Sequence, residues 1–375
     1  MNAIDGLILT PHGWLRGTLT HAAGRIVALL GEPAADQAWR DSPLPIVLPG
    51  FIDLHVHGGG GADTMQAGQA IDTIARTHAR HGTTSLLATT MTAPRGEIEA
   101  ALRAVAGACN TRSDGAARVL GVHLEGPYIS PDMLGAQPAF AATPSAAEIL
   151  ALHALAPIRV VTLAPELPGA LETTAALVAA GIRVQIGHST ASYEQACAAL
   201  QRGASGFTHL FNAMSGLHQR APGAVGAALA HAQHAELIPD LLHVHPGAMR
   251  AALRAIPGLY CVTDATAAAA MPDGEYRLGR HLVRKCASGV RLADGTLAGS
   301  TLTMDQALRN LVEALGLSLR EASLRVSTHA AQYLGLADRG VLAVGASADI
   351  VVVNARLRLR QAIVEGQGID VLDAA

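Results

Sequence analysis

Val47-Leu48-Pro49-Gly50-Phe51-Ile52-Asp53-Leu54-His55-Val56-His57 is an apolar stretch that ends in two histidines separated by one residue. Four glycines, Gly58 to Gly61, follow directly. Because alternate residues of a strand share a face, the pattern predicts a strand that presents His55 and His57 side by side at its C-terminal end. An isolated pair of this kind is more often structural than functional, so its meaning depends on the rest of the chain.

Further β-rich runs follow this strand at regular intervals, at residues 84–89, 118–125, 159–163, 183–188, 206–210, 237–244 and 259–264. Helical patterns separate them, at residues 70–81, 97–108, 172–180, 193–202 and 248–255. Alternating strands and helices predict a parallel sheet, and eight such units predict a (β/α)8 barrel of the TIM type. A doubly wound sheet is the weaker alternative, because no G-x-G-x-x-G follows an early strand.

The two ends of the chain differ from its middle. Residues 4–30 and 349–365 alternate short apolar runs with turn residues, which predicts strands without intervening helices. Neither end alone can bury a sheet, so we expect both to pair into one small β-sandwich. The predicted domains are this sandwich, from residues 1–46 and 344–375, and the barrel, from residues 47–343. Helical segments at 304–315 and 319–334 would connect them.

Composition limits the partners and the compartment. The 375 residues are 50% hydrophobic and 15% charged, which suits one large domain with a small satellite. The net charge is -3 without a block of lysines or arginines, so we expect no nucleic-acid or membrane partner. The sequence opens without a basic, apolar leader, and no apolar run approaches the ~20 residues of a membrane span. Four scattered cysteines suit reduced thiols, and we expect a cytoplasmic protein.

Histidines and carboxylates fall at the C-terminal ends of five predicted strands: His55, His57, Glu125, His188, His209 and Asp264. A barrel brings these ends together at one mouth. Imidazole and carboxylate are the ligands of zinc and similar divalent ions. The sequence therefore predicts a metal site with one or two ions per subunit, for which we expect zinc, with iron, manganese, cobalt or nickel as alternatives.

A series of motifs resembles those of the N-acetylglucosamine-6-phosphate deacetylases of the amidohydrolase superfamily, over residues 46–353. The motifs are Pro49-Gly50-Phe51-Ile52-Asp53, His123-Leu124-Glu125-Gly126-Pro127, Leu163-Ala164-Pro165-Glu166, Gly187-His188-Ser189, Thr208-His209-Leu210-Phe211-Asn212-Ala213-Met214, Val262-Thr263-Asp264-Ala265 and Leu297-Ala298-Gly299-Ser300. The resemblance implies that Glu125, His188 and His209 hold one ion. It also implies that Asp264 is the catalytic proton shuttle and a further ligand. Members of the family differ at the first strand, and this chain, with His55 and His57, is similar to those that hold two ions.

The chain contains a single lysine, Lys285, which lies beyond the eighth predicted strand. Many binuclear amidohydrolases bridge their metals with a carboxylated lysine on strand 4, and Lys285 cannot take that place. An enzyme of the dihydroorotase or hydantoinase type would therefore lack its bridging ligand. In this chain, Glu125 supplies an equivalent anionic oxygen. A Schiff-base aldolase is excluded for the same reason.

The expected chemistry is amide hydrolysis. A divalent ion lowers the pKa of its bound water to about 7, so metal-bound hydroxide would attack the acetyl carbonyl. Asp264 would take the proton of that water and later pass it to the departing amine. The resemblance implies the conversion of N-acetylglucosamine 6-phosphate to glucosamine 6-phosphate and acetate.

The resemblance also implies the substrate contacts, which include Ala136, Gln137, Asn212, Ala213, Arg220, His243, Leu297, Ala298 and Gly299. Arg220 and His243 would bind the phosphate. The arginine would come from a neighbouring subunit, so we expect a homodimer. Asn212 and Ala213 would offer polar contacts, and residues 297–299 a wall over the sugar.

This chain departs from the family at three positions: Gln137 replaces a sugar-contacting histidine, Leu241 replaces a glycine, and His245 stands where aspartate is common. These changes keep other substrates open, such as N-acetylgalactosamine 6-phosphate or another N-acyl amino sugar. An alternative from another functional class is a catalytically inactive barrel that only binds an amino-sugar phosphate. The presence of Asp264 argues against it, because a binding module needs no proton shuttle.

Overall fold

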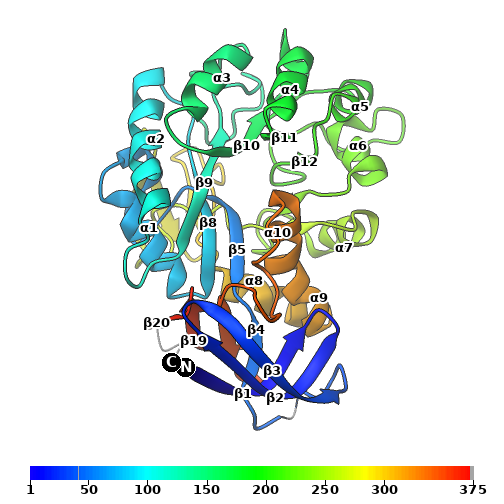
Figure 1. Ribbon diagram of the computed structural model, residues 1–375. Coiled ribbons are helices and arrows are strands. Elements are labelled where there is room, and N and C mark those ends of the chain that lie inside the picture. The colour runs from blue at the N-terminus through cyan, green and yellow to red at the C-terminus, as the bar shows by residue number, and fades with distance from the viewer. Residues whose placement is uncertain (41, 372–375) are drawn as a thin grey trace.

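The computed structural model describes residues 1–40 and 42–371, and its centre is a barrel of parallel strands, of which Figure 1 labels β5 and β8 to β12. The strands are β5 (Phe51–Val56), β8 (Thr83–Thr89), β9 (Arg118–Glu125), β10 (Ile158–Leu163), β11 (Arg183–Ile186), β12 (Gly206–Phe207), β13 (Glu236–Leu237) and β14 (Tyr260–Cys261). Six of them form one sheet in the order β12-β11-β10-β9-β8-β5, and β13 pairs in parallel with β14.

Backbone hydrogen bonds close the ring of strands. The N–H of Leu210, after β12, donates to the carbonyl of Glu236 on β13 across 2.9 Å. The N–H of Asp264, after β14, donates to the carbonyl of His55 on β5, also across 2.9 Å. The predicted (β/α)8 barrel is therefore confirmed.

Helices cover the outside of the barrel: α1 (Ala70–Ala79), α2 (Arg95–Asn110), α3 (Ala146–His153), α4 (Ala170–Ala179), α5 (Tyr193–Gln201), α6 (Gly223–His231) and α7 (Pro246–Ala255) (Figure 1). α2 illustrates the cause, because its buried residues Ile98, Ala101, Leu102 and Val105 recur at helical spacing while Arg103 is exposed. A short turn, η1 (Thr64–Gln66), precedes α1. After the barrel come α8 (Met304–Arg309), η2 (Asn310–Ala314), α9 (Leu319–Ser323), η3 (Leu324–Thr328) and α10 (His329–Leu334).

Both chain ends build one seven-stranded sheet, in the order β20-β19-β18-β4-β1-β2-β3. Its strands are β1 (Asn2–Thr10), β2 (Gly13–Ala22), β3 (Arg25–Ala34), β4 (Ile46–Pro49), β18 (Ile350–Val353), β19 (Leu359–Val364) and β20 (Gln367–Ile369). The N–H of Ile26 on the edge strand β3 donates to the carbonyl of Ala346, just before β18, so the sheet folds over its own core. The expected β-sandwich from both ends is confirmed. The domain boundaries stay predictions, and residues 372–375 lie outside the described chain.

An ion cluster joins this sheet to the barrel. Glu365, at the turn after β19, lies 2.6 Å from Arg118 on β9, 2.5 Å from Arg339 and 3.1 Å from Arg112. Arg339 also pairs with the buried Asp349. The cluster lies near the N-terminal ends of the barrel strands, away from the mouth.

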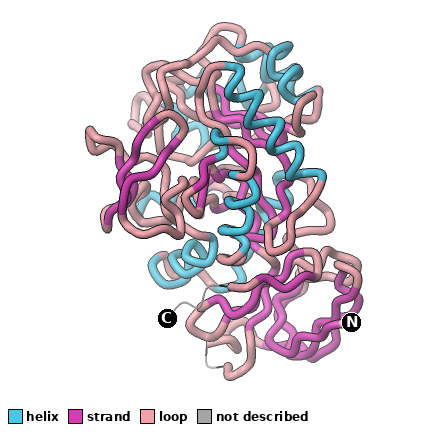
Figure 2. Tube along the Cα trace, turned by 90° about the vertical axis from the view of Figure 1, so that its left-hand side faces the viewer, coloured by secondary structure: helices cyan, strands magenta, loops and turns pink. Residues whose placement is uncertain are grey.

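A three-stranded antiparallel sheet lies beside the mouth and stands out at the left of Figure 2. It comprises β15 (Gly274–Leu278), β16 (His281–Cys286) and β17 (Gly289–Arg291), and a two-stranded ribbon, β6 (Gly58–Gly59) and β7 (Ala62–Asp63), follows β5. Leu278, Val283 and Val290 of this sheet pack against Met91 and Ala298. Lys285 lies on β16, outside the barrel, as its exclusion as a bridging ligand requires. Among the helices described, none has the length and apolar composition that crossing a membrane demands.

Candidate metal centre

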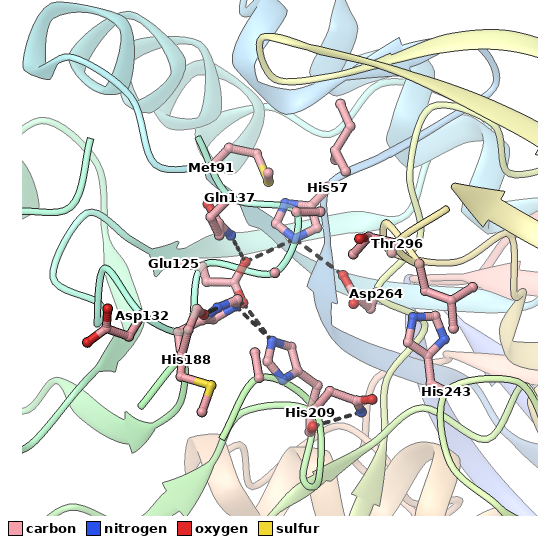
Figure 3. A pocket seen from close by; sticks show the side chains of 18 residues that line it. His57, Met91, Glu125, Asp132, Gln137, His188, His209, His243, Asp264 and Thr296 are labelled. Atoms are coloured by element: carbon pink, nitrogen blue, oxygen red, sulfur yellow. Dashed lines mark hydrogen bonds and ion pairs between the residues drawn. The ribbon is translucent and has the colours of Figure 1, made fainter. Parts of the chain in front are cut away.

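The six predicted ligands meet at the C-terminal mouth of the barrel, and Figure 3 shows all of them except His55. His55 lies on β5, His57 just after it, Glu125 at the end of β9, His188 after β11, His209 after β12 and Asp264 after β14. All six side chains are buried or nearly so. The strand ends therefore bring together residues that are far apart in the sequence.

Glu125 lies at the centre of two groups of ligand atoms. Its Oε1 is 3.2 Å from Nε2 of His188 and 3.1 Å from Nε2 of His209. Its Oε2 is 3.2 Å from Nε2 of His57, which in turn is 3.2 Å from Nε2 of His55. One carboxylate thus belongs to both sets, in the position of a bridging ligand.

The distances within each set fit a divalent metal ion. The Nε2 atoms of His188 and His209 are 3.1 Å apart. Ligands at about 2.0–2.1 Å from a tetrahedral zinc ion lie about 3.3 Å from one another. Two imidazole nitrogens that face each other at this distance need a cation or a proton between them. The donor set is also the one that zinc and its neighbours prefer.

Charge at the centre favours a cation. Burial alone would raise the pKa of Glu125, but His55 and the hydrogen bonds from His188 and His209 hold that pKa well below its usual range. Burial alone would lower the pKa of His57, yet hydrogen bonds to Asp264 and Glu125 raise it to about 9. The carboxylates therefore attract positive charge to the imidazoles, and a bound ion would displace protons from them.

Asp264 stands beside the first set of ligands. Its Oδ1 lies 3.3 Å from Nε2 of His57 and 3.5 Å from Nε2 of His55. Burial acts to raise the pKa of Asp264, but the His55 charge and the hydrogen bond from His57 lower it to about 2. The carboxylate is thus ionised at neutral pH.

Three of these residues have strained backbones. His188, His209 and Asp264 have φ values of 47°, 29° and 50°, in the left-handed region that non-glycine residues rarely adopt. Such conformations gather at functional sites, where the surrounding structure stabilises them. Here they follow immediately after short strands and turn the side chains toward the mouth.

Hydrogen bonds on the far side of two imidazoles direct them. Nδ1 of His188 lies 2.7 Å from the carbonyl of Met133, and Nδ1 of His55 lies 2.9 Å from Oε2 of Glu236. In both cases Nε2 is left for the centre. Within residues 1–40 and 42–371, Nδ1 of His57 and of His209 has no hydrogen-bond partner. Sequence reasoning missed Glu236, although a glutamate inside the apolar run Ala235-Glu236-Leu237-Ile238 is a signal of a special role.

A cavity of about 340 Å³ opens above the centre, at the small end of the range for small-molecule sites. Most of the predicted substrate residues line it: Ala136, Gln137, Asn212, Ala213, His243, Leu297 and Gly299. Met91, Asp132, Met133, Leu278 and Thr296 also line it and were not predicted. Leu278 comes from the three-stranded sheet that the sequence analysis did not anticipate.

Two predicted substrate residues do not reach this cavity. Ala298 is fully buried behind the wall and packs with Met91 and Leu278. Arg220 is exposed in the turn before α6 and is not a cavity residue of its own chain. Gln137 does line the cavity, but its amide contacts Glu125 and the backbone of Thr92.

His243 has a partner that the sequence did not reveal. Its Nδ1 lies 2.7 Å from Oδ2 of Asp240, and Oδ1 of Asp240 accepts the backbone N–H of His243 across 2.9 Å. Burial acts to lower the pKa of His243, but the Asp240 carboxylate raises it overall. Asp240 thus favours the protonated form of an imidazole at the cavity edge, which suits an anionic ligand.

The family model that matches the chain is the Amidohydrolase family, over residues 46–369. The chain belongs to the amidohydrolase family. Among amidohydrolase relatives, it is similar to the N-acetylgalactosamine-6-phosphate deacetylase of Escherichia coli O157:H7, with 41% identity across 96% of this chain and 97% of that protein. It is also similar to the N-acetylglucosamine-6-phosphate deacetylase of Lysinibacillus sphaericus, with 43% identity across 86% and 84%.

The chain is also similar to solved structures of amidohydrolases. One is a mutant N-acetyl-D-glucosamine-6-phosphate deacetylase from Mycobacterium smegmatis, in complex with N-acetyl-D-glucosamine-6-phosphate. It superposes with a TM-score of 0.89 at 33% identity and covers 98% of either chain. The resemblance inferred from the motifs is therefore confirmed at the level of the family.

Proposed function

We propose that this chain hydrolyses the N-acetyl group of N-acetylglucosamine 6-phosphate, giving glucosamine 6-phosphate and acetate. The observation that carries the proposal is the cluster centred on Glu125, with Asp264 beside it, at the floor of a cavity that also holds His243. Amide hydrolysis needs a site for a metal, a proton acceptor and a place for the substrate's charge, and these residues meet all three needs. The names of the relatives agree with this reaction.

The residues proposed to hold metal are His55, His57 and Glu125 for one ion, and Glu125, His188 and His209 for the other, with Asp264 as a further ligand. A divalent ion there acts as a Lewis acid and makes water acidic enough to lose a proton near neutral pH. Zinc is the ion we expect, with iron, manganese, cobalt or nickel as alternatives, in one or two copies per subunit. Glu125→Gln should lose both metal and activity, because a neutral amide is a poor ligand and Glu125 belongs to both sets. Full metal occupancy in that variant would contradict the assignment.

Asp264 is proposed as the proton shuttle. Its ionised Oδ1 takes a proton from the attacking water and later gives it to the nitrogen of the sugar, because an amine leaves readily only when protonated. Asp264 lies beside His57 and lines the cavity, which supports this role.

The substrate phosphate is proposed to bind His243, whose imidazole is held by Asp240 at the edge of the cavity. Arg220 lies outside the cavity of its own chain, so we propose that a second copy supplies it in a homodimer. The homodimer and the cytoplasmic location stay predictions.

N-acetylgalactosamine 6-phosphate is the second candidate substrate. Two observations favour it: Gln137 replaces the histidine expected to touch the sugar, and one relative of nearly equal length is named a deacetylase of this epimer. The two sugars differ in the configuration of one hydroxyl, so they present the same amide and the same phosphate to the site.

The deciding experiment measures acetate release from both N-acetylhexosamine 6-phosphates and from their unphosphorylated forms, with metal quantified in the same sample. The leading proposal predicts the highest kcat/KM for N-acetylglucosamine 6-phosphate. A higher value for the galactose epimer selects the second candidate. The absence of acetate release from all four sugars by metal-loaded protein would contradict both.

A further inference from the structure

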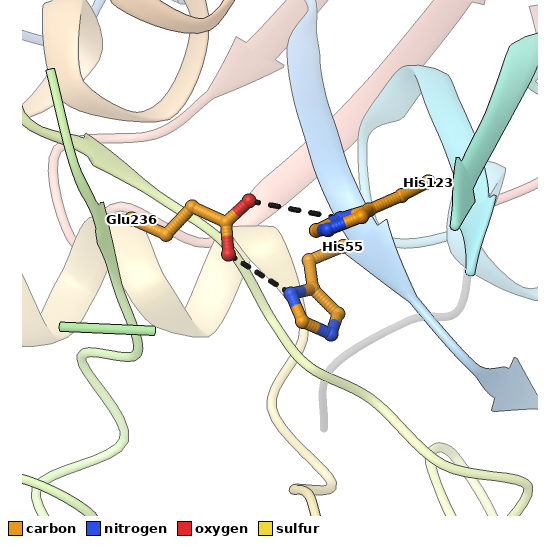
Figure 4. A group of neighbouring side chains, drawn as sticks. All are labelled: His55, His123 and Glu236. Atoms are coloured by element: carbon orange, nitrogen blue, oxygen red, sulfur yellow. Dashed lines mark hydrogen bonds and ion pairs between the residues drawn. The ribbon is translucent and has the colours of Figure 1, made fainter. Parts of the chain in front are cut away.

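Glu236 is a fully buried carboxylate beneath the metal centre, on β13 (Figure 4). Its Oε2 lies 2.9 Å from Nδ1 of His55 and accepts the backbone N–H of His209 across 3.1 Å. Its Oε1 accepts a hydrogen bond from the hydroxyl of Tyr260 across 3.4 Å. It does not line the cavity, so it has no path to a substrate.

The contact with His55 determines which of its ring nitrogens faces the centre. A neutral imidazole carries one proton, and a carboxylate at Nδ1 keeps that proton on Nδ1. The lone pair of Nε2 then points toward Nε2 of His57, 3.2 Å away. If Nδ1 lacked this acceptor, the proton could move to Nε2 and block coordination there.

Glu236 also supports the other set of ligands. His209 has a left-handed backbone with φ of 29°, and its N–H donates to Glu236. One buried carboxylate therefore holds the ring of a ligand from the first set and the backbone of a ligand from the second.

The group of His55, His123 and Glu236 has the spacing of three metal ligands, but its hydrogen bonds are already engaged. Nδ1 of His123 lies 3.0 Å from the carbonyl of Leu54, and its Nε2 lies 2.8 Å from the hydroxyl of Thr162. The group therefore serves as a hydrogen-bonded layer under the centre.

We propose that Glu236 is the positioning residue of this centre, which keeps Nε2 of His55 directed at the ion site shared with His57 and Glu125. The first set of ligands then retains its ion tightly only while a carboxylate at residue 236 reaches Nδ1 of His55. The inference rests on the metal centre of the proposed function and adds a residue that does not itself bind the ion.

The test compares metal binding by wild type, Glu236→Gln, Glu236→Asp and a matched control, Asp53→Asn. Asp53 is an equally buried carboxylate on β5, the strand that carries His55. It accepts hydrogen bonds from Thr263 and from the backbone N–H of His55, and it contacts no ligand ring. Each protein is stripped of metal, reloaded with zinc and titrated against a chelator, and the ions per chain are counted.

For Glu236→Gln we expect the affinity for the ion at His55, His57 and Glu125 to fall about 10- to 100-fold. The affinity for the other ion should fall less, because Glu236 contacts only the backbone N–H of His209 in that set. Glu236→Asp keeps the charge at a shorter reach and should fall between Glu236→Gln and wild type. Asp53→Asn should bind both ions as wild type does. Unfolding temperatures of the metal-free proteins show which variants are folded, and if Glu236→Gln does not fold, Glu236→Asp decides alone.

Wild-type affinity for both ions in Glu236→Gln, or in Glu236→Asp where only that variant folds, would overturn the inference. An equal loss in Asp53→Asn would also overturn it, because the effect would then belong to any buried carboxylate near His55. The proposed function is tested separately, by acetate release from the wild-type protein. Its failure there would leave these metal measurements unchanged.

Discussion

Gln137 donates a hydrogen bond from Nε2 to Oε2 of Glu125 across 2.5 Å, and its Oε1 accepts the backbone N–H of Thr92 across 2.7 Å. These two contacts fix the orientation of the amide and aim it at the carboxylate shared by both ligand sets. The side chain stands where a sugar-contacting histidine was expected. In this chain its amide contacts Glu125.

Gln137→Ala should therefore weaken metal binding by about 10-fold or more, because the carboxylate loses the donor that holds it. We expect kcat to fall further than KM rises. Chelator titration and steady-state kinetics check the two effects. Gln137→Glu, which places a second carboxylate against Glu125, should bind metal more weakly still. Unchanged metal affinity with a raised KM would restore the role of Gln137 as a sugar contact.

Asp264→Asn should lower turnover by at least about 100-fold while substrate still binds, because the amide keeps the shape of the side chain but cannot accept a proton. Steady-state kinetics with metal content measured in parallel separates this loss from a loss of metal. A variant that keeps more than about a tenth of the wild-type turnover would be incompatible with a general base at this position.

Arg220→Ala should reduce kcat/KM for N-acetylglucosamine 6-phosphate mainly through KM, because a charge on a remote phosphate contributes to binding in the ground state and the transition state alike. The wild type should prefer the phosphorylated sugar, and the variant should lose most of that preference. Arg202→Ala is the control, since it removes an exposed arginine at the end of α5. An equal loss of preference in the control would show that the effect comes from removing any exposed positive charge.

The meeting of the six predicted ligands at the barrel mouth could be predicted from the sequence, because each of them lies at the end of an apolar run. Glu236 could not, because the seventh run was expected at residues 237–244, whereas β13 ends at Leu237, shortly before Pro239. α6 (Gly223–His231) was also missed, since its glycines and alanines are buried on almost every side and leave no amphipathic pattern. The side chains that line the cavity depend on packing between distant segments, which periodicity does not encode.

Glu365→Gln should destabilise the protein by about 1–3 kcal/mol at neutral pH, because hydrogen bonds from Arg118 and Arg339 to a charged carboxylate are lost. Burial acts to raise the pKa of Glu365, but these arginines lower it from 4.5 to about 2. Since the folded-state pKa is the lower one, the contribution is complete above about pH 4.5 and is lost as pH falls toward 2. Unfolding measured at pH 7 and pH 3 should show the difference between variant and wild type shrinking. A constant difference would contradict this charge-based account.

Leu241 has a backbone conformation that favours glycine, with φ of 67°, and glycine is the residue that the motif resemblance leads us to expect there. The left-handed region costs an L-residue about 1–2 kcal/mol. Leu241→Gly and Leu241→Ala remove the same packing, but only the glycine relieves that strain. We therefore expect Leu241→Gly to be more stable than Leu241→Ala by about 1 kcal/mol.

Leu242 is the matched control, because it is the next residue, is half exposed and is not among the residues with positive φ. There the order should reverse, with Leu242→Ala more stable than Leu242→Gly by about 0.5–1 kcal/mol, since glycine loses more backbone entropy on folding. Unfolding curves of the four variants decide the matter. The same order at both positions, with alanine more stable, would show that Leu241 carries no strain and that the loop beside His243 tolerates leucine without cost.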